Sequence, residues 1–213
     1  LFDNYSGRSP ASAQHKMGIA DHIGEKRLML SYASKFTPEQ FKQFDQAFRP
    51  KNEAFIKAEL TGKDRTRWHY QRYIKNYLRC VKAVDENIGR MLDYLDRNGL
   101  VENTIVIYSS DQGFWLGEHG WFDKRFMYEE SLKTPILMRF PKEIPAGSVV
   151  NKMIQNLDFA PTFLDYAGLE KPKDMQGNSF RGIVSNKVSE WREAIYYTYY
   201  EYPTAVSYKH LTL

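Results

Sequence analysis

A carboxylate and an amide follow closely on an apolar stretch near the middle of the chain. Residues 104–108 read TIVIY, a β-branched run typical of a buried strand, and Asp111 and Gln112 come soon after it. Their side chains offer oxygen donors, which suit a hard cation such as calcium or magnesium better than zinc. Gly113 allows the backbone to turn close to such an ion. The pattern predicts a metal site at the C-terminal end of a strand.

Lys124 supplies a compact positive charge a short distance after this pair. An ammonium group beside a metal ion can hold an anionic group in place. Alone, Lys124 would be read as a surface lysine, and Asp-Gln-Gly is also a common strand-to-loop turn, so the spacing carries the interpretation. Metal, anion and lysine together indicate hydrolysis of a phosphate or sulfate ester.

A long helix, two strands and a shorter helix are predicted around these residues. Apolar residues at alternating steps of three and four predict a helix over residues 67–98 with one buried stripe. The stripe consists of Tyr70, Ile74, Tyr77, Val81, Val84, Ile88, Met91 and Leu95. The strand at 104–108 then follows after a tight connection, as in an α/β sheet. Residues 135–140, PILMRF, predict a second strand, and residues 158–167, DFAPTFLDYA, a helix.

The two ends of the chain are predicted to be less regular. Residues 1–27 read as an exposed polar loop. Thr37 is a helix N-cap followed by proline, so a short helix should begin there and end at Pro50. Residues 194–200, AIYYTYY, alternate in the manner of an antiparallel strand. The final residues, VSYKHLTL, are given no functional assignment.

Several residues with reactive side chains are interpreted as structural or solvated. Cys80 lies on the predicted long helix and is interpreted as a packed core thiol. His15 and His22 are expected to be exposed to solvent. His69, near the start of the long helix, is expected to have a structural role.

The composition excludes some classes of protein. Of 213 residues, 42% are hydrophobic and 15% aromatic, which is enough for a packed core and argues against disorder. A net charge of +4 is too small and too evenly spread to indicate nucleic-acid binding. Neither a transmembrane stretch nor a signal pattern is present in the sequence, and one cysteine excludes an internal disulfide. Because the chain opens on Leu1, we expect it to be an internal piece of a longer protein.

Three ordered blocks resemble type I sulfatases of the alkaline-phosphatase superfamily. They are residues 77–104, YLRCVKAVDENIGRMLDYLDRNGLVENT, residues 104–135, with SSDQG and LGEHGWFDK, and residues 157–180, LDFAPTFLDYAGLEKPKDMQGNSF. The resemblance implies an α/β fold: part of an alkaline-phosphatase-like mixed sheet with flanking helices. It also implies that residues 1–170 form the later half of the catalytic domain. Residues 171–213 would begin a small, truncated C-terminal subdomain.

The resemblance implies roles for four residues. Asp111 and Gln112 complete a site for one calcium ion, and Lys124 binds the sulfate. Gln112 stands where asparagine is commoner, but it keeps the carbonyl oxygen. His119 either contacts substrate or shapes its loop, and the structural role is favoured.

The family's nucleophile motif is missing from the sequence. In type I sulfatases the nucleophile is a formylglycine made from a C/S-x-P-x-R motif in the N-terminal half of the catalytic domain. The paired aspartates that supply the other calcium ligands are missing here too. We therefore expect the chain to be inactive alone.

The implied reaction is hydrolysis of a sulfate monoester on a sulfated carbohydrate. The sequence around the metal strand most resembles glycan sulfatases, including N-acetylglucosamine-6-sulfatase-like enzymes. Such an enzyme would work in the periplasm or outside the cell, with no nucleic-acid or membrane partner. A phosphonate or phosphate monoester hydrolase of the same superfamily, or a non-catalytic fragment, is the alternative. The oligomeric state stays open.

Overall fold

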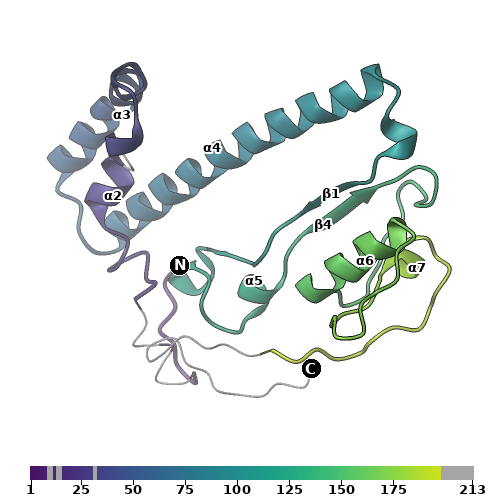
Figure 1. The fold of residues 1–213 in the computed structure, drawn as a ribbon. Coiled ribbons are helices and arrows are strands. Elements are labelled where there is room, and N and C mark those ends of the chain that lie inside the picture. The colour runs from purple at the N-terminus through teal and green to yellow at the C-terminus, as the bar shows by residue number, and fades with distance from the viewer. Residues whose placement is uncertain (9–11, 13–15, 31–32, 198–213) are drawn as a thin grey trace. The chain divides into compact units, whose positions relative to one another are not determined.

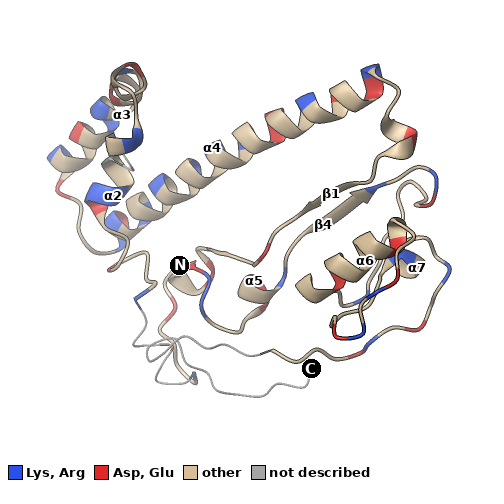
Figure 2. Ribbon diagram, viewed as in Figure 1, with Lys and Arg blue, Asp and Glu red and all other residues tan. Residues whose placement is uncertain are grey.

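The computed structural model describes residues 1–8, 12, 16–30 and 33–197 (Figure 1). The chain forms two compact units. The first unit comprises Leu1–Gly89 and Gly113–Leu132, and the second comprises Arg90–Gln112 and Lys133–Glu201. Basic and acidic residues are interspersed along both (Figure 2). None of the described helices is long and apolar enough to span a membrane. A domain boundary near residue 170 stays a prediction.

Helix α3 (Pro38–Ala58) begins where the sequence predicts it, after α2 (Glu25–Leu30) and a short 3-10 turn (Ala33–Lys35). The Thr37 hydroxyl accepts the Gln40 N–H at 3.2 Å, and the Gln40 side chain accepts the Thr37 N–H at 3.0 Å. This reciprocal pair satisfies two amides that a helix start leaves unpaired.

The predicted end of this helix at Pro50 is wrong, because α3 continues to Ala58. A proline inside a helix costs about 3 kcal/mol. Packing of the following turns offsets that cost: Phe55 is buried and stacks on Trp68 with ring centroids 3.6 Å apart. In addition, the Arg72 guanidinium donates to Asn52 Oδ1 at 3.0 Å.

Helix α4 (Gly62–Arg97) confirms the predicted long helix and begins five residues before it. His69 is buried on its first turns. The ring lies 3.0 Å from the carbonyl oxygen of Ile19 and 2.9 Å from Glu25 Oε1, which confirms the structural interpretation.

The predicted burial along α4 is wrong for its later part. Val81, Val84 and Met91 are 42%, 47% and 68% exposed, and Cys80 is exposed rather than packed in a core. Periodicity identifies the apolar face of a helix, but it does not establish what lies against that face.

The prediction of an exposed loop over residues 1–27 is wrong in part. Met17, Ile19 and Ile23 are buried. Met17 packs with Trp115, Trp121 and other aromatic residues, while Ile19 and Ile23 pack with Leu28 under α4. These apolar side chains anchor a loop whose composition is otherwise polar. His22 is exposed, as predicted, and His15 lies outside the described residues.

The rest of the first unit is a small hairpin followed by one helical turn. Strands β2 (Trp115–Leu116) and β3 (Phe122–Asp123) pair antiparallel around a 3-10 turn, Glu118–Gly120. Helix α5 (Glu129–Leu132) follows.

Both predicted strands appear in the second unit, slightly shortened. After the 3-10 turn Val101–Asn103, strand β1 (Val106–Ser109) pairs antiparallel with β4 (Ile136–Arg139), and Tyr108 lies opposite Leu137. Helices on either side of this pair in the sequence complete an α/β arrangement (Figure 1).

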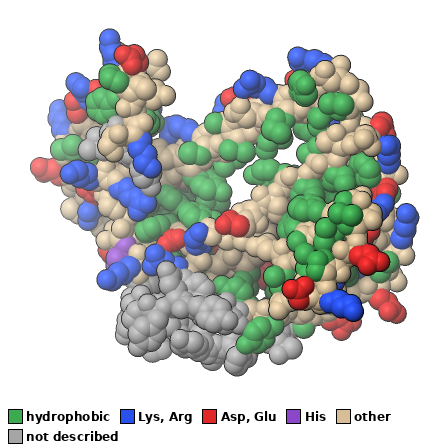
Figure 3. Space-filling view, in the orientation of Figure 1, with side chains coloured by type: hydrophobic (Ala, Val, Ile, Leu, Met, Phe, Trp, Pro, Cys, Tyr) green, Lys and Arg blue, Asp and Glu red, His purple; other side chains and the backbone are tan. Residues whose placement is uncertain are grey.

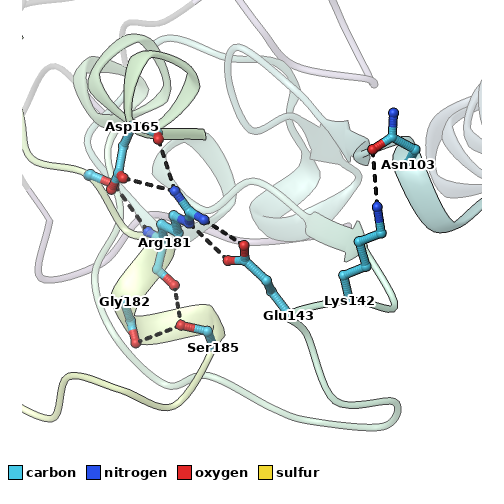
Figure 4. Close-up of polar contacts among 8 residues, drawn as sticks. Asn103, Lys142, Glu143, Asp165, Arg181, Gly182 and Ser185 are labelled. Carbon is cyan, nitrogen blue, oxygen red and sulfur yellow. Dashed lines mark hydrogen bonds and ion pairs between the residues drawn. The ribbon is translucent and has the colours of Figure 1, made fainter. Parts of the chain in front are cut away.

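The predicted helix at 158–167 is confirmed as α6 (Phe159–Tyr166), which follows the 3-10 turn Asn156–Asp158. Helix α7 (Arg181–Val184) contributes to the core of the unit. Figure 4 shows Arg181 donating to Glu143 after β4 and to Asp165 on α6. These charge-assisted bonds tie three segments together.

Apolar side chains also reach the surface of the second unit. Figure 3 shows them around β4 and α6, where Leu137 is 66% and Phe163 52% exposed. The strand predicted at 194–200 is wrong for residues 194–197, which have no regular structure. The remainder of that segment and the VSYKHLTL end lie outside the described residues.

Candidate active site

Asp111 and Gln112 lie together in a turn that begins where β1 ends. The Ser110 hydroxyl donates to the Gln112 carbonyl oxygen at 2.8 Å, and the Gln112 N–H points back at the same hydroxyl at 3.4 Å. A serine bonding to its own backbone in this way favours a turn over a continued strand. The Asp111 side chain is exposed and that of Gln112 half-buried, so both oxygens can reach a ligand.

Gly113, the next residue, is required by packing. A Cβ at this position would lie 2.1 Å from the carbonyl oxygen of Glu130, and the Gly113 N–H donates to the Ser131 carbonyl at 2.9 Å. The glycine therefore allows a close approach to the backbone of α5 within the first unit, whereas the sequence interpretation ascribed it to a nearby ion.

The oxygen donors of the turn fit calcium by their chemistry. Calcium takes six to eight oxygen ligands, and Asp111 and Gln112 can supply two of them. In the described part of the chain, no group of three or more His, Cys, Asp or Glu residues could hold a metal ion. On its own, the turn offers fewer oxygen ligands than calcium requires.

His119 lies in the loop between β2 and β3 of the first unit. Its Nδ1 is 3.0 Å from Asp3 Oδ2 and 2.8 Å from Arg8 Nη2, and Arg8 also pairs with Asp3 at 2.8 Å. Because arginine only donates, Nδ1 accepts from Arg8 in one tautomer and donates to Asp3 in the other. The Tyr5 N–H and the His119 ring, with help from Arg8, hold the pKa of Asp3 below its usual value.

Aromatic rings surround this charged group. Trp115 and Trp121 are fully buried and meet edge to face at 4.9 Å, and the Arg8 guanidinium lies 5.8 Å from the Tyr128 ring. His119 itself has a φ of 54°, a strained value for a residue with a side chain. The aromatic packing and the bonds to Asp3 and Arg8 hold it there.

Lys124 follows β3 and is exposed. Its neighbour Arg125 pairs with Asp123 at 3.1 Å, whereas Lys124 makes no ion pair to the described residues. Its ammonium group is therefore free to meet an external anion.

The structure brings these residues together as two pairs. Asp111 and Gln112 share one turn of the second unit, while in the first unit His119 lies in the turn before β3 and Lys124 directly follows β3. The sequence interpretation missed the partners of His119, because Asp3 and Arg8 lie more than a hundred positions away in a segment read as loop.

Comparisons with known proteins cover nearly the whole chain. The family described as "N-sulphoglucosamine sulphohydrolase, C-terminal" matches residues 117–212. The chain is 44% identical to an N-acetylglucosamine-6-O-sulfatase of Bacteroides thetaiotaomicron, over 98% of this chain and 41% of that relative. It is also 39% identical to the Drosophila melanogaster "Extracellular sulfatase SULF-1 homolog", over 52% of this chain and 10% of the relative. The chain thus spans well under half the length of these relatives.

Solved structures of related enzymes also match the chain. The fold matches BT4656 in complex with D-glucosamine-2-N,6-O-disulfate with a TM-score of 0.88 and 44% identity, over 95% of this chain and 45% of that one. A phosphonate monoester hydrolase from Silicibacter pomeroyi matches with a TM-score of 0.58 and 23% identity, over 89% of this chain and 36% of that one, which shows a shared fold alone. The sequence resemblance is thereby confirmed, and the chain belongs to the sulfatases of the alkaline-phosphatase superfamily.

Proposed function

We propose that this protein is a sulfatase that hydrolyses sulfate esters of a sulfated glycan, with a 6-O-sulfated glucosamine unit as its substrate class. The observation that carries this proposal is the 44% identity to an N-acetylglucosamine-6-O-sulfatase over 98% of the chain. The segment with the Asp111–Gln112 turn and Lys124 lies within that match. An extracellular sulfatase among the relatives supports a periplasmic or secreted location.

Four residues of the chain have separate roles in this proposal. Asp111 and Gln112 would hold one calcium ion through their side-chain oxygens, and the exposed Lys124 ammonium would bind the sulfate. When bound, the ion would offset negative charge that builds on the sulfuryl group. His119 holds the turn between β2 and β3 and is a candidate for contact with the sugar. The nucleophile, a formylglycine, and the other calcium ligands are not supplied by these residues.

The test uses the protein expressed from its complete reading frame, in a host that matures formylglycine. We expect it to release inorganic sulfate from N-acetylglucosamine 6-sulfate and to act far more slowly on an aryl phosphate or a phosphonate monoester. Faster turnover of the phosphorus esters would favour the hydrolase alternative. No turnover of any ester would favour a non-catalytic protein.

The 213 residues expressed alone provide the matching negative control. They lack the C/S-x-P-x-R motif, so we expect no sulfate release from them. Activity of this short chain would contradict the proposed nucleophile.

A further inference from the structure

The 3-10 turn Asn156–Asp158 is held unusually firmly within the second unit. Asp158 is fully buried, and its carboxylate accepts the Gln155 N–H at 2.8 Å, the Asn178 N–H at 2.9 Å and both terminal nitrogens of Arg192. Every carboxylate oxygen thus has two donors. A buried charge with this many hydrogen bonds fixes the backbone around it.

Two further contacts secure the same turn. Gly177, at a φ of 82°, packs so closely that a Cβ there would lie 2.1 Å from the Leu157 carbonyl oxygen. The Thr162 hydroxyl donates to the Asp158 carbonyl at 2.6 Å and accepts the Phe180 N–H at 3.0 Å. The turn therefore offers a rigid base for any side chain that projects from it.

Asn156 projects from this base to the Asp111–Gln112 turn. Its amide nitrogen donates to the Asp111 carbonyl oxygen at 2.8 Å, across 45 positions of sequence. That carbonyl belongs to the peptide unit that joins Asp111 to Gln112. Holding it fixes the rotation of this peptide, and with it the directions in which the two side chains leave the backbone.

We propose that Asn156 is a positioning residue that aims the oxygens of Asp111 and Gln112 at a divalent cation. The proposal rests on the proposed function, because it takes these two side chains as metal ligands. Partners that orient metal ligands without touching the metal commonly change affinity tenfold to hundredfold when they are removed. The buried Asp158, paired with Arg192, lies two positions along the chain from Asn156 and anchors the turn that carries it.

The test compares Asn156→Leu with Asn151→Leu in the protein expressed from its complete reading frame. Leucine keeps the branched shape of asparagine and removes the donor. Asn151 is an exposed amide of the same segment, with no hydrogen bond to the described residues, so it serves as the matched control. Calcium affinity is measured by titration calorimetry, and melting temperature is measured in calcium and in excess chelator.

We expect Asn156→Leu to weaken calcium binding by about tenfold or more. Its melting temperature in chelator should equal that of the control, while the rise produced by calcium should shrink. Unchanged calcium affinity would overturn the proposal, as would an equal loss of melting temperature with and without calcium, which indicates a merely structural bond. If the unaltered protein hydrolyses sulfate esters but binds no calcium, the positioning role falls while the sulfatase assignment stands.

Discussion

The candidate residues of the second unit and those of the first are held by different physical means. The Asp111–Gln112 turn depends on hydrogen bonds, from Ser110 and from Asn156 on a turn anchored by a buried carboxylate. The β2–β3 segment, here named the packed loop, has His119 in its turn and Lys124 directly after it. It depends on packing of Trp115 and Trp121, around a backbone with positive φ at His119. Polar bonds set direction well but tolerate little change of partner, whereas aromatic packing supplies stability to a strained loop.

Hydrogen bonds and aromatic packing suit different functional groups. In the role proposed for Asp111 and Gln112, a metal ligand must point in a defined direction, and the peptide that joins them accepts a hydrogen bond at 2.8 Å. In the role proposed for Lys124, a lysine acts as a point charge, which is compatible with an exposed position next to the packed loop. Substitutions in one region should therefore leave the other intact.

The largest expected effect is that of Asp111→Ala. Loss of the only carboxylate in the turn should remove bound calcium and reduce sulfate release below detection in the protein expressed from its complete reading frame. Calcium content and turnover of an aryl sulfate measure the two effects. Asp174→Ala, at an exposed carboxylate of the same unit, should leave both unchanged. Full activity and full calcium content in Asp111→Ala would contradict the metal assignment.

Trp121→Ala should disrupt the packed loop and leave the turn Asn156–Asp158 of the second unit in place. Removing a fully buried tryptophan typically lowers the free energy of unfolding by about 3–5 kcal/mol. Urea unfolding measures this loss, and Phe41→Ala, at a 38% exposed site of the same unit, is the control. Hydrogen exchange at the amides of Gln155 and Asn178 should stay slow. Equal loss of protection in both units would show that the two regions are not independent.

Lys124→Ala should act on the reaction without affecting stability. If the ammonium stabilises charge in the transition state more than in the bound substrate, kcat should fall by about a hundredfold. Lys124→Arg should recover only part, because a planar guanidinium does not replace a compact ammonium. Lys133→Ala, at another exposed lysine, is the control. Wild-type kcat in Lys124→Ala on a glycan sulfate and on an aryl sulfate would show that Lys124 is a surface residue with no role in the reaction.

Local patterns predicted the elements but not the contacts between them. The long helix, β1 and α6 follow from apolar patterning, and the start of α3 follows from its Thr37 N-cap; both signals act over a few residues. Helix α3 continues past Pro50 because Phe55 packs on Trp68, a tertiary contact that no local rule contains. The same holds for the site residues: Asp111 could be found from its strand, but its bond to Asn156 spans 45 positions.

The smallest expected effect is that of low pH. It should distinguish the turn Asn156–Asp158, which supports the Asp111–Gln112 turn, from the packed loop. Burial alone would raise the pKa of Asp158, but donors from Arg192, Asn178 and Gln155 outweigh it, so the pKa lies below its usual value near 4. The folded state therefore holds the proton less tightly than the unfolded state. The stabilisation is complete above the unfolded pKa and is lost as the pH falls through the folded pKa.

Hydrogen-exchange protection at the Gln155 and Asn178 amides should accordingly be level from pH 7 to about 5 and fall below about pH 4. In Asp158→Asn, which cannot ionise, protection should be lower at neutral pH and should lack this acid step. Amides of the packed loop, such as that of Trp121, should show no step attributable to Asp158. A step of equal size in Asp158→Asn would assign the acid sensitivity to another carboxylate. It would contradict the view that the charge of Asp158 stabilises this turn.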